Sequence, residues 1–140
     1  MDLDPAPPEG FARHDRTSPL TQSWEPLYSR KTERSVILAF RAATPHTNSR
    51  GFVHGGMITA LADNAMGLSC KRVLRGDASL VTVTLAMNFL GTAQVGQWVE
   101  IVPTVTRAGS TLCFAEATVT ADGEPCGRAH ATFRVIGPKP

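Results

Sequence analysis

Residues 50–70, RGFVHGGMITALADNAMGLSC, predict one long helix that is apolar on nearly every side. Such a helix is buried over most of its surface, and a flat sheet covers only part of it. The rest of the chain must therefore supply a sheet that curls around this helix. One candidate strand, residues 34–41, precedes the helix, and four candidate strands follow it.

The segments after the helix have the alternating pattern of strands. In residues 80–89 the apolar side chains of one face are Val81, Val83, Leu85, Met87 and Phe89. Three further strands are expected at residues 98–106, 111–120 and 127–135, with turns at residues 91–96, 108–110 and 122–125. Short turns join antiparallel neighbours, so the sequence predicts an α+β fold with one antiparallel sheet packed on one helix.

The length of 140 residues suits a single compact domain. We expect this domain to span residues 18–136, between a flexible N-terminal tail at residues 1–17 and a C-terminal tail at residues 137–140. Within the domain, a short helix is expected to begin at Ser18 and to end at Pro26.

Composition excludes several classes of function. The formal net charge is only +2, without a long basic run, which argues against nucleic acid as a partner. The uncharged stretch at residues 51–62 is too short to cross a bilayer, so no membrane partner is expected. The three cysteines show no C-x-x-C spacing and no signal peptide is recognised, which favours a cytoplasmic location. The histidines lack metal-ligand spacing, and no metal is predicted.

The helix carries one carboxylate on a stripe of small residues. At about 100° per residue, Gly56, Ala60, Asp63 and Gly67 fall on nearly the same side and form a groove. A carboxylate on such a surface is costly unless it is paired, hydrogen-bonded or wet. Asp63 is therefore either a general base or nucleophile, or an acid satisfied by a neighbouring group or by water.

His54 and Asp63 cannot meet on one helix. Nine residues separate them, which places them on opposite sides and about 13.5 Å apart along the axis. A site that contains both needs either a histidine off the helix or two subunits, with Asp63 donated across a two-fold interface. His54 also has a simpler interpretation as a helix-start residue that is satisfied locally.

The start of the helix offers hydrogen-bond donors. The free N–H groups of Gly55 and Gly56 carry partial positive charge and lack side chains that would block a carbonyl oxygen, as an oxyanion hole requires. Asn48 could donate its amide to the same oxygen or orient a water. The alternatives are a tight turn at the two glycines and a plain turn residue at Asn48.

Together these residues form the string N-x-x-G-x-x-H-G-G-x-x-x-x-x-x-D-x-A-x-G, from Asn48 to Gly67. With the downstream strands, the chain resembles the hotdog-fold acyl-CoA thioesterases of the PaaI type, named for phenylacetate degradation. The resemblance implies a curled five-stranded antiparallel sheet around one long central helix. It also implies a homodimer with a continuous sheet, commonly a dimer of dimers (a homotetramer), whose sites lie at the dimer interface.

The resemblance also assigns roles to residues. It implies that the N–H of Gly55 or Gly56 polarises the thioester carbonyl, and that Asn48 and His54 hold the carbonyl or the water. Asp63 of the neighbouring subunit would be the general base or nucleophile. Thr84 matches a position that orients the acid or water in the family, although it is also an ordinary strand threonine.

For the CoA moiety of the substrate, the resemblance points to the turn that holds Arg107, Gly109 and Ser110. The implied activity is hydrolysis of an acyl-CoA thioester to free acid and CoA, without a cofactor. Two alternatives stay open: a hotdog enoyl-thioester hydratase, and a non-catalytic acyl-CoA binding protein. The acyl group, aryl-acetyl or fatty, is not specified by the sequence.

Overall fold

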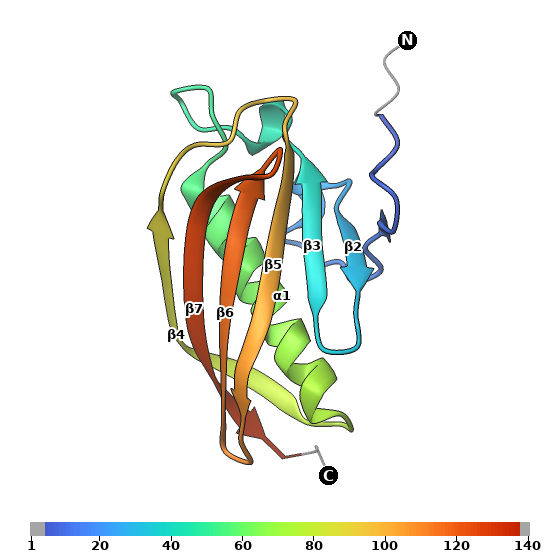
Figure 1. Ribbon diagram of the computed structural model, residues 1–140, viewed down its shortest axis with the longest axis vertical. Coiled ribbons are helices and arrows are strands. Elements are labelled where there is room, and N and C mark those ends of the chain that lie inside the picture. The colour runs from blue at the N-terminus through green and yellow to red at the C-terminus, as the bar shows by residue number, and fades with distance from the viewer. Residues whose placement is uncertain (1–4, 138–140) are drawn as a thin grey trace.

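The computed structural model describes residues 5–137 and shows one long helix packed in the curve of an antiparallel sheet (Figure 1). Residues 1–4 and 138–140, which belong to the two expected tails, lie outside the described residues. The helix is α1, Gly55–Leu74. The strands are β1 (Ala12–Arg13), β2 (Tyr28–Lys31), β3 (Val36–Arg41), β4 (Ser79–Phe89), β5 (Trp98–Ala108), β6 (Leu112–Ala121) and β7 (Glu124–Ile136).

The sheet has seven strands, in the order β1-β2-β3-β5-β6-β7-β4, rather than the five expected. The additional strands are the short β1 and β2, which extend the sheet beyond β3. All neighbouring strands are antiparallel, and β5, β6 and β7 form a meander with tight turns. The expected helix, the strand before it and the four strands after it are confirmed. β4 forms the other edge of the sheet.

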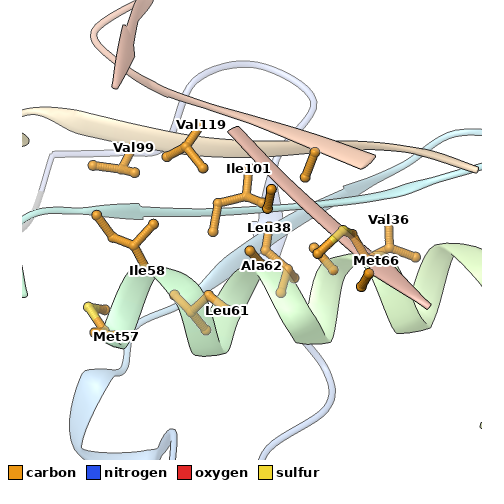
Figure 2. Close-up of a cluster of buried hydrophobic side chains, with 14 of the residues drawn as sticks. Val36, Leu38, Met57, Ile58, Leu61, Ala62, Met66, Val99, Ile101 and Val119 are labelled. Carbon is orange, nitrogen blue, oxygen red and sulfur yellow. The ribbon is translucent and has the colours of Figure 1, made fainter. Parts of the chain in front are cut away.

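The core lies between α1 and the concave face of the sheet (Figure 2). From the helix it receives Met57, Ile58, Leu61, Ala62 and Met66, and from the strands Val36, Leu38, Val99, Ile101 and Val119. One polar side chain joins helix to sheet inside this core. Buried Ser69 donates its hydroxyl to the Ala65 carbonyl at 2.7 Å and accepts the N–H of Val36 at 2.9 Å.

The N-terminal part of the domain differs from the sequence prediction. No α-helix forms after Ser18; the structure has a 3-10 turn at Gln22–Trp24, because the hydroxyls of Ser18 and Thr21 close a local turn. Part of the expected tail, residues 11–14, lies against the sheet. The Phe11 ring packs edge-on against Trp98 at 5.3 Å, in a second and smaller apolar cluster.

A bulge in β4 reverses which face its side chains occupy. Thr82 lies opposite Phe133 of β7, and Thr84 lies opposite Thr132, so Val83 is the additional residue. Directly opposite residues share a face of the sheet. Since Phe133 is buried and approaches Gly67 of α1, Thr82 faces the helix, whereas Thr84 faces away from it.

Within residues 5–137, no helix is both long and apolar enough to span a membrane.

Candidate functional site

His54 is the N-cap of α1, and its ring accepts a hydrogen bond from one of the two N–H groups that were expected to form an oxyanion hole. The N–H of Gly56 donates to His54 Nδ1 at 2.8 Å. A ring nitrogen that accepts this bond carries no proton, so the proton of the neutral imidazole lies on Nε2. The Gly56 N–H is therefore engaged within the chain.

Gly55 lies beneath the ring of Phe89, the last residue of β4. A Cβ built on Gly55 would lie 2.8 Å from Phe89 Cζ, so the exposed Phe89 ring would have to shift to admit a side chain there. Among residues 5–137, no acceptor is bound to the Gly55 N–H. The first N–H groups of a helix have no partner within the helix, so this donor points out at the positive end of α1. Close packing and an available donor both favour glycine here.

Asn48 organises the loop before the helix. Its Oδ1 accepts the N–H of Arg50 at 2.9 Å and of Phe52 at 3.4 Å, so the turn interpretation of this residue is right in part. No acceptor for its side-chain NH2 group lies within hydrogen-bond distance among the described residues. The amide thus retains donors for a ligand while its oxygen shapes the loop.

Asp63 lies half-buried midway along α1 and is hydrogen-bonded to the sheet. Its Oδ1 accepts the hydroxyl of Thr82 at 2.8 Å. The resemblance pointed to Thr84 for this role; the β4 bulge turns Thr84 to the opposite face, so within one chain Thr82 is the threonine that contacts Asp63. A regular strand would have placed both threonines on one face, and no local sequence signal marked the additional residue.

A cleft of about 460 Å³ contains Asp63 and Thr82. This volume is within the usual range for small-molecule sites. The cleft is bounded by α1, by the start of β4 and by residues of the N-terminal segment from His14 to Thr21. Asn48, His54 and Gly55 are not among its lining residues, so one chain does not bring the helix start and Asp63 into the same cleft.

The sequence did not indicate the N-terminal wall of this cleft. His14 and Arg16 line it although residues 1–17 were expected to be a tail without function. Lys71 also lines it, and a signal for this residue existed: it lies four positions after Gly67 and continues the same side of the helix.

The turn between β5 and β6 lies at the end of the sheet where α1 ends, away from the helix start (Figure 1). Arg107 and Ser110 are exposed there. The N–H of Gly109 donates to the Leu112 carbonyl at 2.9 Å, and a Cβ on Gly109 would come equally close to that oxygen. The Gly109 N–H is thus hydrogen-bonded within the turn, whereas the side chains of Arg107 and Ser110 are exposed to solvent.

Among residues 5–137, no group of three His, Cys, Asp or Glu side chains is arranged to hold a metal. The three cysteines are buried and free. Burial raises the pKa of the Cys126 thiol, and burial together with a contact to Cys113 raises the pKa of Cys70. Thiols with raised pKa values are poor nucleophiles.

Residues 50–127 match the family model described as "Thioesterase superfamily". Among similar proteins, one from Pseudomonas aeruginosa whose name calls it an esterase is 32% identical over 129 residues, which is 91% of this chain and 96% of that protein. The human protein named acyl-coenzyme A thioesterase 13 is 31% identical over 85 residues, 61% of this chain and 60% of that protein.

Solved structures share the fold. A Streptococcus mutans protein bound to acetyl CoA matches with a TM-score of 0.77 at 24% identity, covering 91% of this chain and 98% of that one. A variant of the phenylacetic acid degradation protein PaaI from Thermus thermophilus matches with a TM-score of 0.74 at 19% identity, covering 84% and 98%. These likenesses confirm the hotdog arrangement of one helix and a curled sheet.

Proposed function

This chain belongs to the thioesterase superfamily and is a thioester hydrolase, and from that premise we propose that it cleaves an acyl-CoA to a free acid and CoA. Two observations on similar proteins support this substrate class: one relative is named an acyl-coenzyme A thioesterase, and one structure of the same fold holds acetyl CoA. Within this chain, the contact of Asp63 with Thr82 inside a cleft carries the proposal.

In the proposed reaction, the thioester oxygen accepts the Gly55 N–H at the start of α1, with the Asn48 amide and the His54 ring beside it. The helix start favours the negative charge that develops on this oxygen. Asp63 acts either as general base on a water that attacks the carbonyl carbon, or as nucleophile on that carbon. The C–S bond then breaks, and CoA leaves as a thiolate that takes up a proton. In the second case water then hydrolyses the acyl–Asp63 anhydride and releases the acid. Single-turnover hydrolysis in oxygen-18 water separates the two roles, because a nucleophilic carboxylate transfers its own oxygen.

We propose that each site contains two protomers, because Asp63 and the helix start do not share a cleft within one chain. β4 is the proposed contact. It is an edge strand. The strand and the residue that follows it expose five apolar side chains: Val81, Val83, Leu85, Phe89 and Leu90. A long apolar edge left uncovered invites pairing with another strand. A two-fold pairing of β4 with its copy would extend the sheet across both chains and cover these side chains.

For the CoA moiety, the proposed phosphate contacts are Arg107, Ser110 and the backbone at Gly109. Arg107 and Ser110 are exposed at the β5–β6 turn, where a guanidinium and backbone N–H groups suit a phosphate.

The first test is free-thiol release from aryl and straight-chain acyl-CoAs by the wild type and by Asp63→Asn. We expect the variant to keep its fold and its CoA affinity while its turnover falls by several powers of ten, because Asn retains the shape without the base. A loss of less than tenfold would remove Asp63 from the chemistry. Saturable acyl-CoA binding without thiol release by the wild type would instead indicate a binding protein.

Mixing two inactive variants tests the shared site. Asn48→Asp keeps the oxygen that shapes the loop but removes the amide donor, and Asp63→Asn removes the acid. If the two residues come from different protomers, random exchange of subunits restores about one quarter of the wild-type sites, since half of the dimers are mixed and each has one intact site. No recovery after exchange, checked by mass, would contradict the shared site.

A further inference from the structure

The cleft that begins at Asp63 has an apolar middle. Toward the end of α1 its lining includes Gly67 and Leu68 of the helix, Leu80 of β4 and Phe133 of β7, beside the polar side chains of Asn64 and Ser79. The Phe133 ring would lie 3.3 Å from a Cβ on Gly67, so the missing side chain keeps this part of the cleft open beside the ring. On the opposite wall the hydroxyls of Ser18 and Thr21 are hydrogen-bonded to each other. An acyl chain therefore suits the middle of the cleft.

The far end of the same cleft is cationic. Arg16 and Lys71 line it, and neither has a carboxylate within 4.0 Å among residues 5–137. Beside them lies His14, which is only 9% exposed and whose Nδ1 has no hydrogen-bond partner in the same part of the chain. Arg16 and Lys71 are exposed, so water solvates them and both are free to pair with an anionic ligand. The nearest acid to the buried His14 Nδ1 is Asp15, whose Oδ1 lies 3.9 Å away, beyond hydrogen-bond distance.

A neighbouring cleft strengthens this charge. It shares His14, Arg16, Leu68 and Lys71 with the first cleft, so these residues stand where the two meet. Its lining carries five cations, Arg16, Lys31, Lys71, Arg72 and Arg75, and one anion, Asp15, which is paired with Lys31 at 3.2 Å. Cations gathered along a concave surface raise the local concentration of anions.

Building on the proposed function, we propose that this thioesterase prefers acyl groups that carry a carboxylate at the end remote from the thioester, held by Arg16 and Lys71. Lys71 is eight residues after Asp63, about 12 Å along the helix axis, which fits an acyl chain of medium length.

The test compares acyl-CoAs in matched pairs: adipoyl-CoA with hexanoyl-CoA, and suberoyl-CoA with octanoyl-CoA. For the wild type we expect kcat/KM to be at least about tenfold higher for the carboxylated member of a pair, as expected for a charge-assisted contact. Arg16→Gln and Lys71→Gln should each reduce this preference about tenfold. Arg128→Gln, on the exposed surface of β7 and outside both clefts, is the matched control and should leave the preference unchanged.

Two results would overturn the proposal. One is a wild type that hydrolyses both members of each pair equally, which would leave the proposed function standing. The other is an equal loss for both members in Arg16→Gln and Lys71→Gln, which would show that these cations bind a phosphate of CoA. If no acyl-CoA is hydrolysed at all, the proposed function fails. Calorimetric affinities of Asp63→Asn for the same pairs then decide whether the carboxylate is preferred.

Discussion

Replacing Thr82 with valine should slow the enzyme, whereas the same replacement at Thr84 should not. The Thr82 hydroxyl donates to Asp63 Oδ1 at 2.8 Å and holds the carboxylate in one orientation. Hydrogen bonds to charged groups contribute about 1.5–3 kcal/mol, and the lower figure applies because this pair is partly exposed. If that contribution is needed in the transition state, kcat for thiol release falls about tenfold. Thr84 faces away from α1, so Thr84→Val should keep kcat within about twofold of the wild type.

The two valine variants make the same chemical change two residues apart on an edge strand, so their stabilities should agree within about 0.5 kcal/mol. Urea unfolding checks this before the kinetics are compared. Thr82→Ser retains a hydroxyl and should recover most of the lost kcat. The reasoning fails if Thr84→Val is as slow as Thr82→Val, or if Thr82→Val matches the wild type.

Three further outcomes follow from the fold. Ser69→Ala should lower the free energy of unfolding by about 1–3 kcal/mol, because the buried N–H of Val36 loses its acceptor; an unchanged urea midpoint would contradict this. Burial lowers the pKa of His46 below its ordinary 6.5, so the unfolded chain binds a proton that the folded chain does not. The stability that the neutral His46 contributes to the fold is therefore present above pH 6.5 and is lost as the pH falls below that value. The free energy of unfolding of His46→Gln should fall less on acidification than that of the wild type. Val83→Lys places a charge on the exposed edge of β4 and should give an inactive monomer by light scattering, whereas Thr118→Lys on β6 should not.

The local pattern of apolar and polar residues predicted the main helix and strands, because each shows the hydrophobic pattern of its own type of structure. The helix is apolar on nearly every side, and β5, β6 and β7 alternate over much of their length between short turns. β1 and β2 were missed because they are only two and four residues long and depend on pairing for their structure. The helix expected at Ser18 does not form, because the hydroxyls of Ser18 and Thr21 are hydrogen-bonded in a local turn.

The candidate site was predicted only as far as it is local. The string from Asn48 to Gly67 located the helix start and Asp63, and nine residues of helix separated them, as the sequence required. The sequence could not show that the His54 ring accepts a hydrogen bond from the Gly56 N–H, because this depends on the rotamer of His54. Nor could it show Thr82 in place of Thr84, because the bulge is fixed by pairing with β7. The cytoplasmic location, the dimer and its assembly into a dimer of dimers stay predictions.

The two walls of the cleft at Asp63 differ in how firmly they are built. One wall is α1, whose far side is locked into the main core, so a substitution there disturbs the whole domain. The other is the segment from His14 to Thr21, anchored through a two-residue strand and one turn. Of the two cations proposed to select the acyl group, Arg16 thus lies on a different part of the chain from Asp63, whereas Lys71 shares α1 with it. Exchange of this segment between relatives offers a way to redirect the enzyme to new acyl groups while the acid and its hydroxyl partner stay in place.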